Sequence, residues 1–168
     1  GGPGRGALLA TGSADFYGGP AVIAIDIGGT KMEVGIVAAN GAIRRRARHA
    51  TNTADPWSTL TALIDAVVGA ERGFAAVGVG CGGPMTPNGE TVSPLNIDGW
   101  RDFPLRAELV SKLGLAVFID NDAKALALGE SRFGAAQRER MFLAMGGSPV
   151  LCPAIVLDGP TLPGEPAP

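Results

Sequence analysis

Residues 21–37 read AVIAIDIGGTKMEVGIV, two apolar runs separated by a short polar and glycine-rich stretch. Each apolar run has the length and composition of a buried strand. Between them, Gly28 and Gly29 supply freedom in φ and lack side chains, so backbone N–H groups in the turn can close around an anion. Thr30 adds a hydroxyl group, and Lys31 adds a positive charge. This stretch predicts two strands joined by a phosphate-binding turn.

Asp26 stands at the end of the first predicted strand. A carboxylate at this position can hold Mg²⁺, directly or through water, beside the phosphates of a nucleotide. The competing interpretation is a glycine-rich hairpin with an exposed lysine, because the motif D-x-G-G-T-K is short. The other motifs of the chain favour the phosphate-binding turn.

A second strand that ends in polar residues is predicted at 116–120, and a helix follows at once, from about 122 to 133. Asp122 therefore lies where a strand delivers a side chain into a cleft. A carboxylate there can accept the proton of a sugar hydroxyl as the oxygen attacks a γ-phosphate. Asn121 can donate to hydroxyl groups and accept from them. Asp122 is equally suited to cap the helix, and the two roles are compatible.

Residues 75–100 form the third informative segment, AAVGVGCGGPMTPNGETVSPLNIDGW. It predicts a strand at 75–80 and then a long loop rich in Gly, Pro and Asn, which can form one wall of a ligand site. Gly78, Gly80 and Gly83 satisfy the pattern G-x-G-x-x-G. Pro84 and a turn-rich loop follow, however, where the dinucleotide-binding fingerprint requires a helix, so we exclude a Rossmann site.

Five segments together resemble the N-terminal domain of the ROK family of bacterial sugar kinases and repressors. They are IAIDIGGTKMEVGIV, GVGCGGPM, SPLNIDGW, FPLRAEL and FIDNDAKALALGE, and the resemblance runs from about Ala21 to Met145. It implies ATP-dependent phosphorylation of a hexose, most often glucose, with Mg²⁺ in the cleft between two domains of an actin-like fold. A homodimer is also expected for the family.

The resemblance also implies roles for single residues. Asp122 corresponds to the catalytic base, Asn121 to a sugar ligand, and Asn96 to a weaker candidate for a sugar contact. Gly82 and Gly83 correspond to the sugar-side loop. The first phosphate motif corresponds to Asp26, Gly28, Gly29, Thr30 and Lys31, with Asp26 as an indirect ligand of Mg²⁺.

The predicted order of elements supports the same α/β fold. Asn40-Gly41 is a strong signal for a two-residue hairpin turn, and Asp55-Pro56 for the start of a helix. A second predicted helix ends at Gly114. The order strand-strand-strand-helix-strand-helix-strand-helix is that of a ribonuclease H-like, actin-like ATPase domain, with a mixed five-stranded sheet and helices on both faces. The first three strands are predicted at about 21–27, 32–39 and 42–49.

The same order of elements raises a rival enzyme class, the ribonuclease H-type nucleases, which need several carboxylates that converge on two metal ions. The predicted strand at 75–80 carries no carboxylate, and the first helix offers only Asp65. The sequence therefore disfavours a nuclease.

Composition fits one soluble, cytoplasmic domain. The 168 residues are 46% hydrophobic and 18% charged, with a net charge of -2, so no nucleic-acid or membrane partner is expected. Cys81 and Cys152 have no paired spacing, which suits a reducing compartment. The basic cluster at 44–48, followed by His49, lacks interleaved aromatic residues and is interpreted as a solvated strand face.

The two ends of the chain depart from this pattern. Residues 1–20 are expected to be a flexible leader, residues 21–140 the N-terminal domain, and residues 141–168 an aberrant start of a truncated second domain. Pro149 and Pro153 remove backbone donors where the family's second phosphate turn is expected. The family's zinc site is also expected to be absent. We therefore expect this chain alone to be inactive; the alternative is a non-catalytic, sugar-binding regulator or a pseudogene-like fragment of a ROK-type repressor.

Overall fold

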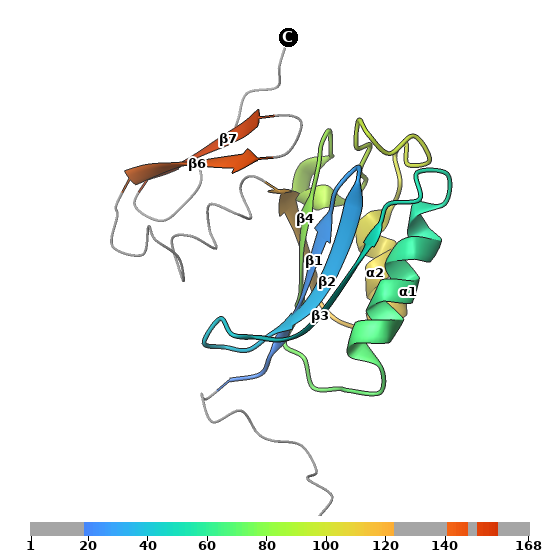
Figure 1. The fold of residues 1–168 in the computed structure, drawn as a ribbon, viewed down its shortest axis with the longest axis vertical. Helices are drawn as coiled ribbons and strands as arrows, with labels where there is room; N and C mark the ends of the chain where they lie inside the picture. The colour runs from blue at the N-terminus through green and yellow to red at the C-terminus, as the bar shows by residue number, and fades with distance from the viewer. Residues whose placement is uncertain (1–18, 123–140, 148–150, 158–168) are drawn as a thin grey trace, which may run out of the picture.

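The structure is a computed structural model, and it describes residues 19–122, 141–147 and 151–157. Over the first range the chain forms one five-stranded mixed sheet with the strand order β3-β2-β1-β4-β5 (Figure 1). The strands are β1 (Val22–Ile27), β2 (Lys31–Val37), β3 (Ile43–Ala50), β4 (Val77–Cys81) and β5 (Val117–Asn121). The helices are α1 (Pro56–Val68), the short 3₁₀ helix η1 (Pro87–Gly89) and α2 (Leu105–Leu113).

Strands β1, β4 and β5 run parallel, whereas β2 pairs antiparallel with both β1 and β3. The pairing aligns Ile27 with Cys81, and Cys81 with Asn121. The three parallel strands therefore end at the same edge of the sheet. The segments that follow them, which hold the three motifs found in the sequence, emerge side by side at this edge.

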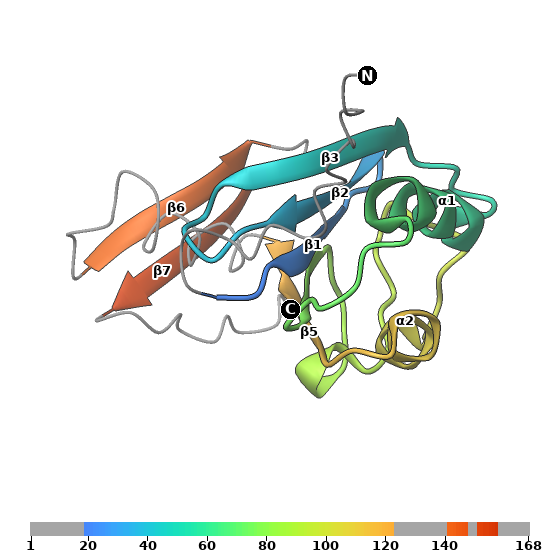
Figure 2. The same cartoon turned by 90° about the horizontal axis from the view of Figure 1, so that it is seen from below.

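One face of the sheet carries most of the core, and α1 and α2 both lie on this face (Figure 2). Alternate residues of β1 point into it, so Ile23, Ile25 and Ile27 are buried. On α1, Leu60 and Ile64 are buried at helical spacing and pack in the same cluster. The buried residues of β1 and the buried residues of α1 thus meet in a single core.

Both ends of α1 follow from local sequence. Its N-terminus is capped by the Asp55 carboxylate, which accepts a hydrogen bond from the Ser58 N–H at 3.3 Å, and Pro56 is the first helical residue. At the other end the chain leaves the helix through Gly69, whose φ is 53°. The predicted start at Asp55-Pro56 is confirmed.

The turn between β2 and β3 differs from the prediction. Ala38 N–H donates to the Ala42 carbonyl at 2.9 Å, and Gly41 N–H donates to the Ala38 carbonyl at 2.9 Å. The loop therefore contains three residues instead of two, with Gly41 in the left-handed region at a φ of 86°. This is a turn followed by a glycine bulge, a common alternative for an Asn-Gly pair.

Two expectations concern the later part of the chain. The chain turns helical at Asp122, but the rest of the helix expected at about 122–133 lies outside the described residues. In the region expected to begin a second domain, β6 (Met141–Gly147) pairs antiparallel with β7 (Leu151–Leu157) in a two-stranded sheet. Pro153 lies in β7 opposite Met145. The segment containing Pro149 and the expected leader are not described.

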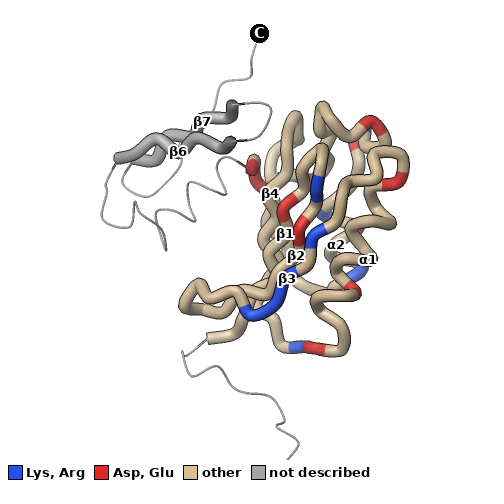
Figure 3. The backbone as a smooth tube through the Cα atoms, in the orientation of Figure 1, with Lys and Arg blue, Asp and Glu red and all other residues tan. Residues whose placement is uncertain are grey.

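The basic cluster lies on β3, an outer strand of the sheet, and acidic positions lie on the neighbouring strands (Figure 3). Arg44 Nη1 lies 3.1 Å from a carboxylate oxygen of Glu71, and Arg45 contacts the same carboxylate. Arg46 pairs with Glu33 at 3.5 Å. The cluster is thus a solvent-exposed strand face with ion pairs, as predicted. None of the helices in the described ranges is long and apolar enough to cross a membrane.

The core position of Leu60 yields a stability prediction. Its side chain is 0% exposed, so Leu60→Ala removes buried methyl groups and leaves a cavity. We expect the free energy of unfolding to fall by about 2–5 kcal/mol, measured by urea denaturation. The matched control is Leu95→Ala, where the leucine is 73% exposed and a loss of less than about 0.5 kcal/mol is expected. Equal losses in the two variants would contradict this core.

Candidate phosphate and sugar site

The turn between β1 and β2 has the geometry of an anion-binding turn. Gly28 N–H donates to the Lys31 carbonyl at 3.0 Å and closes the turn. Within the described part of the chain, the N–H groups of Gly29 and Thr30 donate to no protein acceptor. The side chains of Thr30 and Lys31 are exposed beside them. These groups can therefore bind the oxygens of a phosphate.

Of the two reasons predicted for the glycines of this turn, the structure supports the absence of side chains and not the freedom in φ. Neither has a φ in the left-handed region. A Cβ on Gly28 would lie 2.9 Å from the Lys31 carbonyl oxygen, and a Cβ on Gly29 would lie 2.4 Å from Cβ of Asn96. The constraint at both positions is close approach of other atoms, and φ freedom plays no part.

Asn96 lies on the long loop after β4, and buried neighbours hold it in place. Ile97 and Trp100 are buried, and the Trp100 ring stacks on Phe103 with a centroid distance of 4.5 Å. Leu95 N–H donates to the Gly83 carbonyl at 3.3 Å, which ties this loop to the start of the sugar-side segment. Asn96 itself is exposed. The loop therefore presents the Asn96 side chain next to the phosphate turn.

Arg101 adds a second anchor that the sequence did not suggest. Its Nη1 donates to three backbone carbonyls, those of Pro94, Ile97 and Trp100, at 3.2, 2.9 and 2.7 Å. An arginine that binds carbonyls of its own loop leaves no pattern in the sequence, so only the structure could identify it.

The third motif follows β5. Asn121 is the last residue of this strand, opposite Cys81, and Asp122 comes next. Gly82 and Gly83 follow Cys81 on the neighbouring strand. The fold thus brings every predicted site residue to one edge of the sheet.

Electrostatics confirm that two predicted carboxylates are near each other. The pKa of Asp26 is raised above its ordinary value of 3.8, first by burial and then by the negative charges of Asp122 and Glu33, while Lys31 lowers it. Although the Asp26 side chain reaches solvent, the surrounding protein removes enough water to disfavour its charge. Within the described residues no group of three His, Cys, Asp or Glu side chains could hold a metal ion directly, so the role of Asp26 as an indirect ligand of Mg²⁺ stays a prediction.

Cys81 lies buried beneath the same edge. Burial raises the pKa of its thiol to about 12, and the charges of Asp122 and Asp26 act in the same direction. Cys81 is thus a small buried apolar side chain.

Thr51 also contacts the phosphate turn, although the sequence did not point to it. The Thr51 hydroxyl donates to the Gly28 carbonyl at 2.7 Å, and Thr51 N–H donates to the Thr30 carbonyl at 2.9 Å. Thr51 directly follows β3, where no motif drew attention to it.

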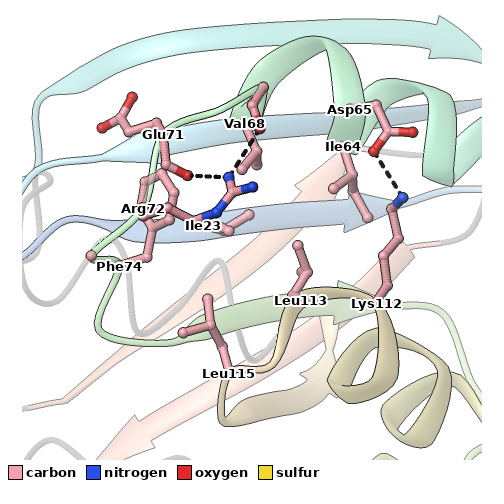
Figure 4. Close-up of a pocket in the computed structure, with 12 residues that line it drawn as sticks. Ile23, Ile64, Asp65, Val68, Glu71, Arg72, Phe74, Lys112, Leu113 and Leu115 are labelled. Carbon is pink, nitrogen blue, oxygen red and sulfur yellow. Dashed lines mark hydrogen bonds and ion pairs between the residues drawn. The ribbon is translucent and has the colours of Figure 1, made fainter.

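A cavity of ≈ 210 Å³ lies at the other end of the domain and holds none of the predicted site residues (Figure 4). Its wall includes Ile23, which belongs to the start of β1, whereas Asp26 belongs to the end of this strand. Asp65 pairs with Lys112 across the cavity rim at 2.8 Å. Asp65 therefore cannot join Asp26 in the two-metal arrangement of a nuclease, in agreement with the sequence analysis.

Comparison with known proteins decides the family, because the sequence profile described as "ROK family" matches residues 22–159. The chain belongs to the ROK family. The glucokinase of Streptomyces coelicolor is 39% identical over 122 residues, which are 70% of this chain and 38% of that protein. The N-acetyl-D-glucosamine kinase of Erwinia tasmaniensis is 38% identical over 120 residues, or 69% of this chain and 37% of that protein.

A solved ROK structure shows the same fold. The ROK family glucokinase from Streptomyces griseus, in complex with glucose and AMPPNP, superposes with a TM-score of 0.78 at 31% identity. The match covers 86% of this chain and 47% of that one. The chain thus spans between about a third and a half of the length of these ROK relatives.

The raised pKa of Asp26 predicts a pH-dependent effect of Asp26→Asn. Above the ordinary pKa of 3.8 the unfolded state loses its proton before the folded state does, so wild-type stability falls as pH rises through the folded pKa. An Asn side chain does not titrate in this range, so it causes no such fall in stability. We expect the stability of Asp26→Asn relative to wild type to increase with pH across this window, in urea unfolding with EDTA present. A difference that is constant from pH 3 to 7 contradicts the assigned burial and charge effects.

The raised pKa of Cys81 predicts an unreactive thiol. In a Cys152→Ser background, Cys81 is the single thiol of the chain. We expect a disulfide reagent such as DTNB to modify it at pH 8 only after urea unfolds the protein, because the folded state holds almost no thiolate. Rapid modification of the folded protein would show that Cys81 is accessible.

Proposed function

We propose that this ROK domain takes part in the ATP-dependent phosphorylation of a hexose, with glucose converted to glucose 6-phosphate. The observation that carries the proposal is the meeting of three segments at the ends of parallel strands. They are the phosphate turn after β1, the loop after β4 that leads to Asn96, and the pair Asn121-Asp122 at the end of β5. The similarity to a glucokinase that was solved with glucose and AMPPNP supports it.

In the proposed reaction, Asn121 and Asn96 bind hydroxyl groups of the sugar and orient one of them toward the γ-phosphate. The sugar oxygen attacks the phosphorus atom, its proton passes to the Asp122 carboxylate, and the bond from phosphorus to the bridging oxygen of ADP breaks. Lys31 and the N–H groups of the turn at Gly29 and Thr30 bind the phosphates. Mg²⁺, when bound through Asp26, neutralises phosphate charge.

A second domain is part of the proposal, with residues 21–140 as the N-terminal domain and residues 141–168 as the beginning of the next. Most catalysis of phosphoryl transfer comes from positioning and from charge stabilisation in a site closed to water. This domain supplies one side of such a site. We propose that it binds sugar and nucleotide weakly when alone and does not turn them over.

The role of Asp122 can be tested in a hybrid enzyme, in which residues 21–145 of this chain replace the matching segment of the Streptomyces coelicolor glucokinase. We expect the hybrid to form glucose 6-phosphate from glucose and MgATP. Asp122→Asn should lower its kcat by about 10²- to 10⁴-fold, because the general base is lost, and leave glucose affinity nearly unchanged. The matched control is Asp65→Asn, the same change on α1 at the other end of the domain.

Retained turnover in Asp122→Asn would exclude this residue as the base. Tight glucose binding by an active-site-intact hybrid that shows no turnover would instead favour the regulator. Measuring glucose 6-phosphate formation by the 168-residue chain itself tests the proposal that one domain is insufficient.

A further inference from the structure

We infer that Thr51 is a positioning residue that stabilises the shape of the phosphate turn and joins this turn to the loop at 96–99. Its side chain and its backbone bind the two sides of the turn. The hydroxyl donates to the Gly28 carbonyl at 2.7 Å, and the N–H donates to the Thr30 carbonyl at 2.9 Å. Both carbonyls thereby point toward Thr51, the residue directly after β3. Since a peptide unit is planar, fixing these carbonyls also fixes the N–H groups of Gly29 and Lys31.

Thr51 is itself anchored through the next residues. The Asn52 side-chain oxygen accepts hydrogen bonds from Ala54 N–H at 3.2 Å and Asp55 N–H at 3.4 Å. Asp55 in turn caps α1. The segment from Thr51 to Asp55 is therefore a short, locally bonded connection, and it ties the phosphate turn to the first turn of a helix packed on the core.

The same segment contacts the loop at 96–99. Gly99 N–H donates to the Thr53 carbonyl at 3.2 Å, and a Cβ on Gly99 would lie 2.8 Å from that oxygen. Asn96, at the other end of this loop, packs directly against Gly29. The phosphate turn, the segment at 51–53 and the loop at 96–99 thus form a closed ring of contacts.

This inference rests on the proposed function only where it concerns ligands. The structural part is that loss of the Thr51 hydroxyl loosens the turn, whatever the turn binds. The functional part is that a looser turn binds nucleotide less well, because its N–H groups must be ordered again on binding.

The structural part is tested on the 168-residue chain by amide hydrogen exchange. Thr51→Val keeps the shape of the side chain and removes the donor, whereas Thr51→Ser keeps the donor. The matched control is Thr61→Val, which removes a hydroxyl that donates to the Ser58 carbonyl at 3.1 Å on α1. We expect exchange of the Gly28 amide to be about 2- to 10-fold faster in Thr51→Val and unchanged in the other two variants.

Unchanged exchange at Gly28 in Thr51→Val overturns the inference. Equally faster exchange throughout the sheet also overturns it, because Thr51 would then contribute only to global stability. Faster exchange that is confined to the turn and to the loop at 96–99 supports it.

The functional part is tested by titrating the same variants with Mg-AMPPNP and, separately, with glucose. We expect Thr51→Val to weaken nucleotide affinity about 2- to 10-fold and Thr51→Ser to restore it. Unaltered affinity in Thr51→Val, despite a loosened turn, overturns the functional part. If the wild-type chain binds neither ligand, the proposal that this domain alone binds sugar and nucleotide fails, while the exchange measurement still decides the role of Thr51.

Discussion

The candidate site depends on the parallel pairing of β1, β4 and β5. Their register sets Ile27, Cys81 and Asn121 next to one another, so the residue after each strand enters the same space. Hydrophobic burial on the helix-covered face stabilises this register, because a shift of one residue would move the isoleucines of β1 to the opposite face. The core therefore determines where the polar residues at the strand ends meet.

Several carboxylates lie close together at the ends of the parallel strands, above the apolar core. Burial raises the pKa of Asp26, the carboxylates of Asp122 and Glu33 raise it further, and Lys31 lowers it. The buried Cys81 adds no countercharge. A set of like charges at the end of a well-packed sheet costs stability, and a bound cation beside phosphates would relieve that cost.

Sequence patterns predicted the sheet and two helices, because the spacing of apolar residues reflects which side chains are buried. They also predicted that the three motifs follow strands. They failed where tertiary contacts decide the geometry. The Asn40-Gly41 pair indicates a turn but not whether Ala39 joins the loop. The contact between Gly29 and Asn96 joins residues far apart in the chain, and Thr51 acts through backbone carbonyls that any residue carries. Such features have no local pattern from which to predict them.

Two Gly-Gly pairs occur at the candidate site, and their glycines are constrained in different ways. Gly29 must lack a side chain because Asn96 occupies the position that a Cβ would take. At Gly82, by contrast, no atom of the described chain lies within 4 Å of that position. The absence of a side chain there is not needed for packing within the described residues. One glycine thus allows the two loops to touch, whereas no close contact constrains the other.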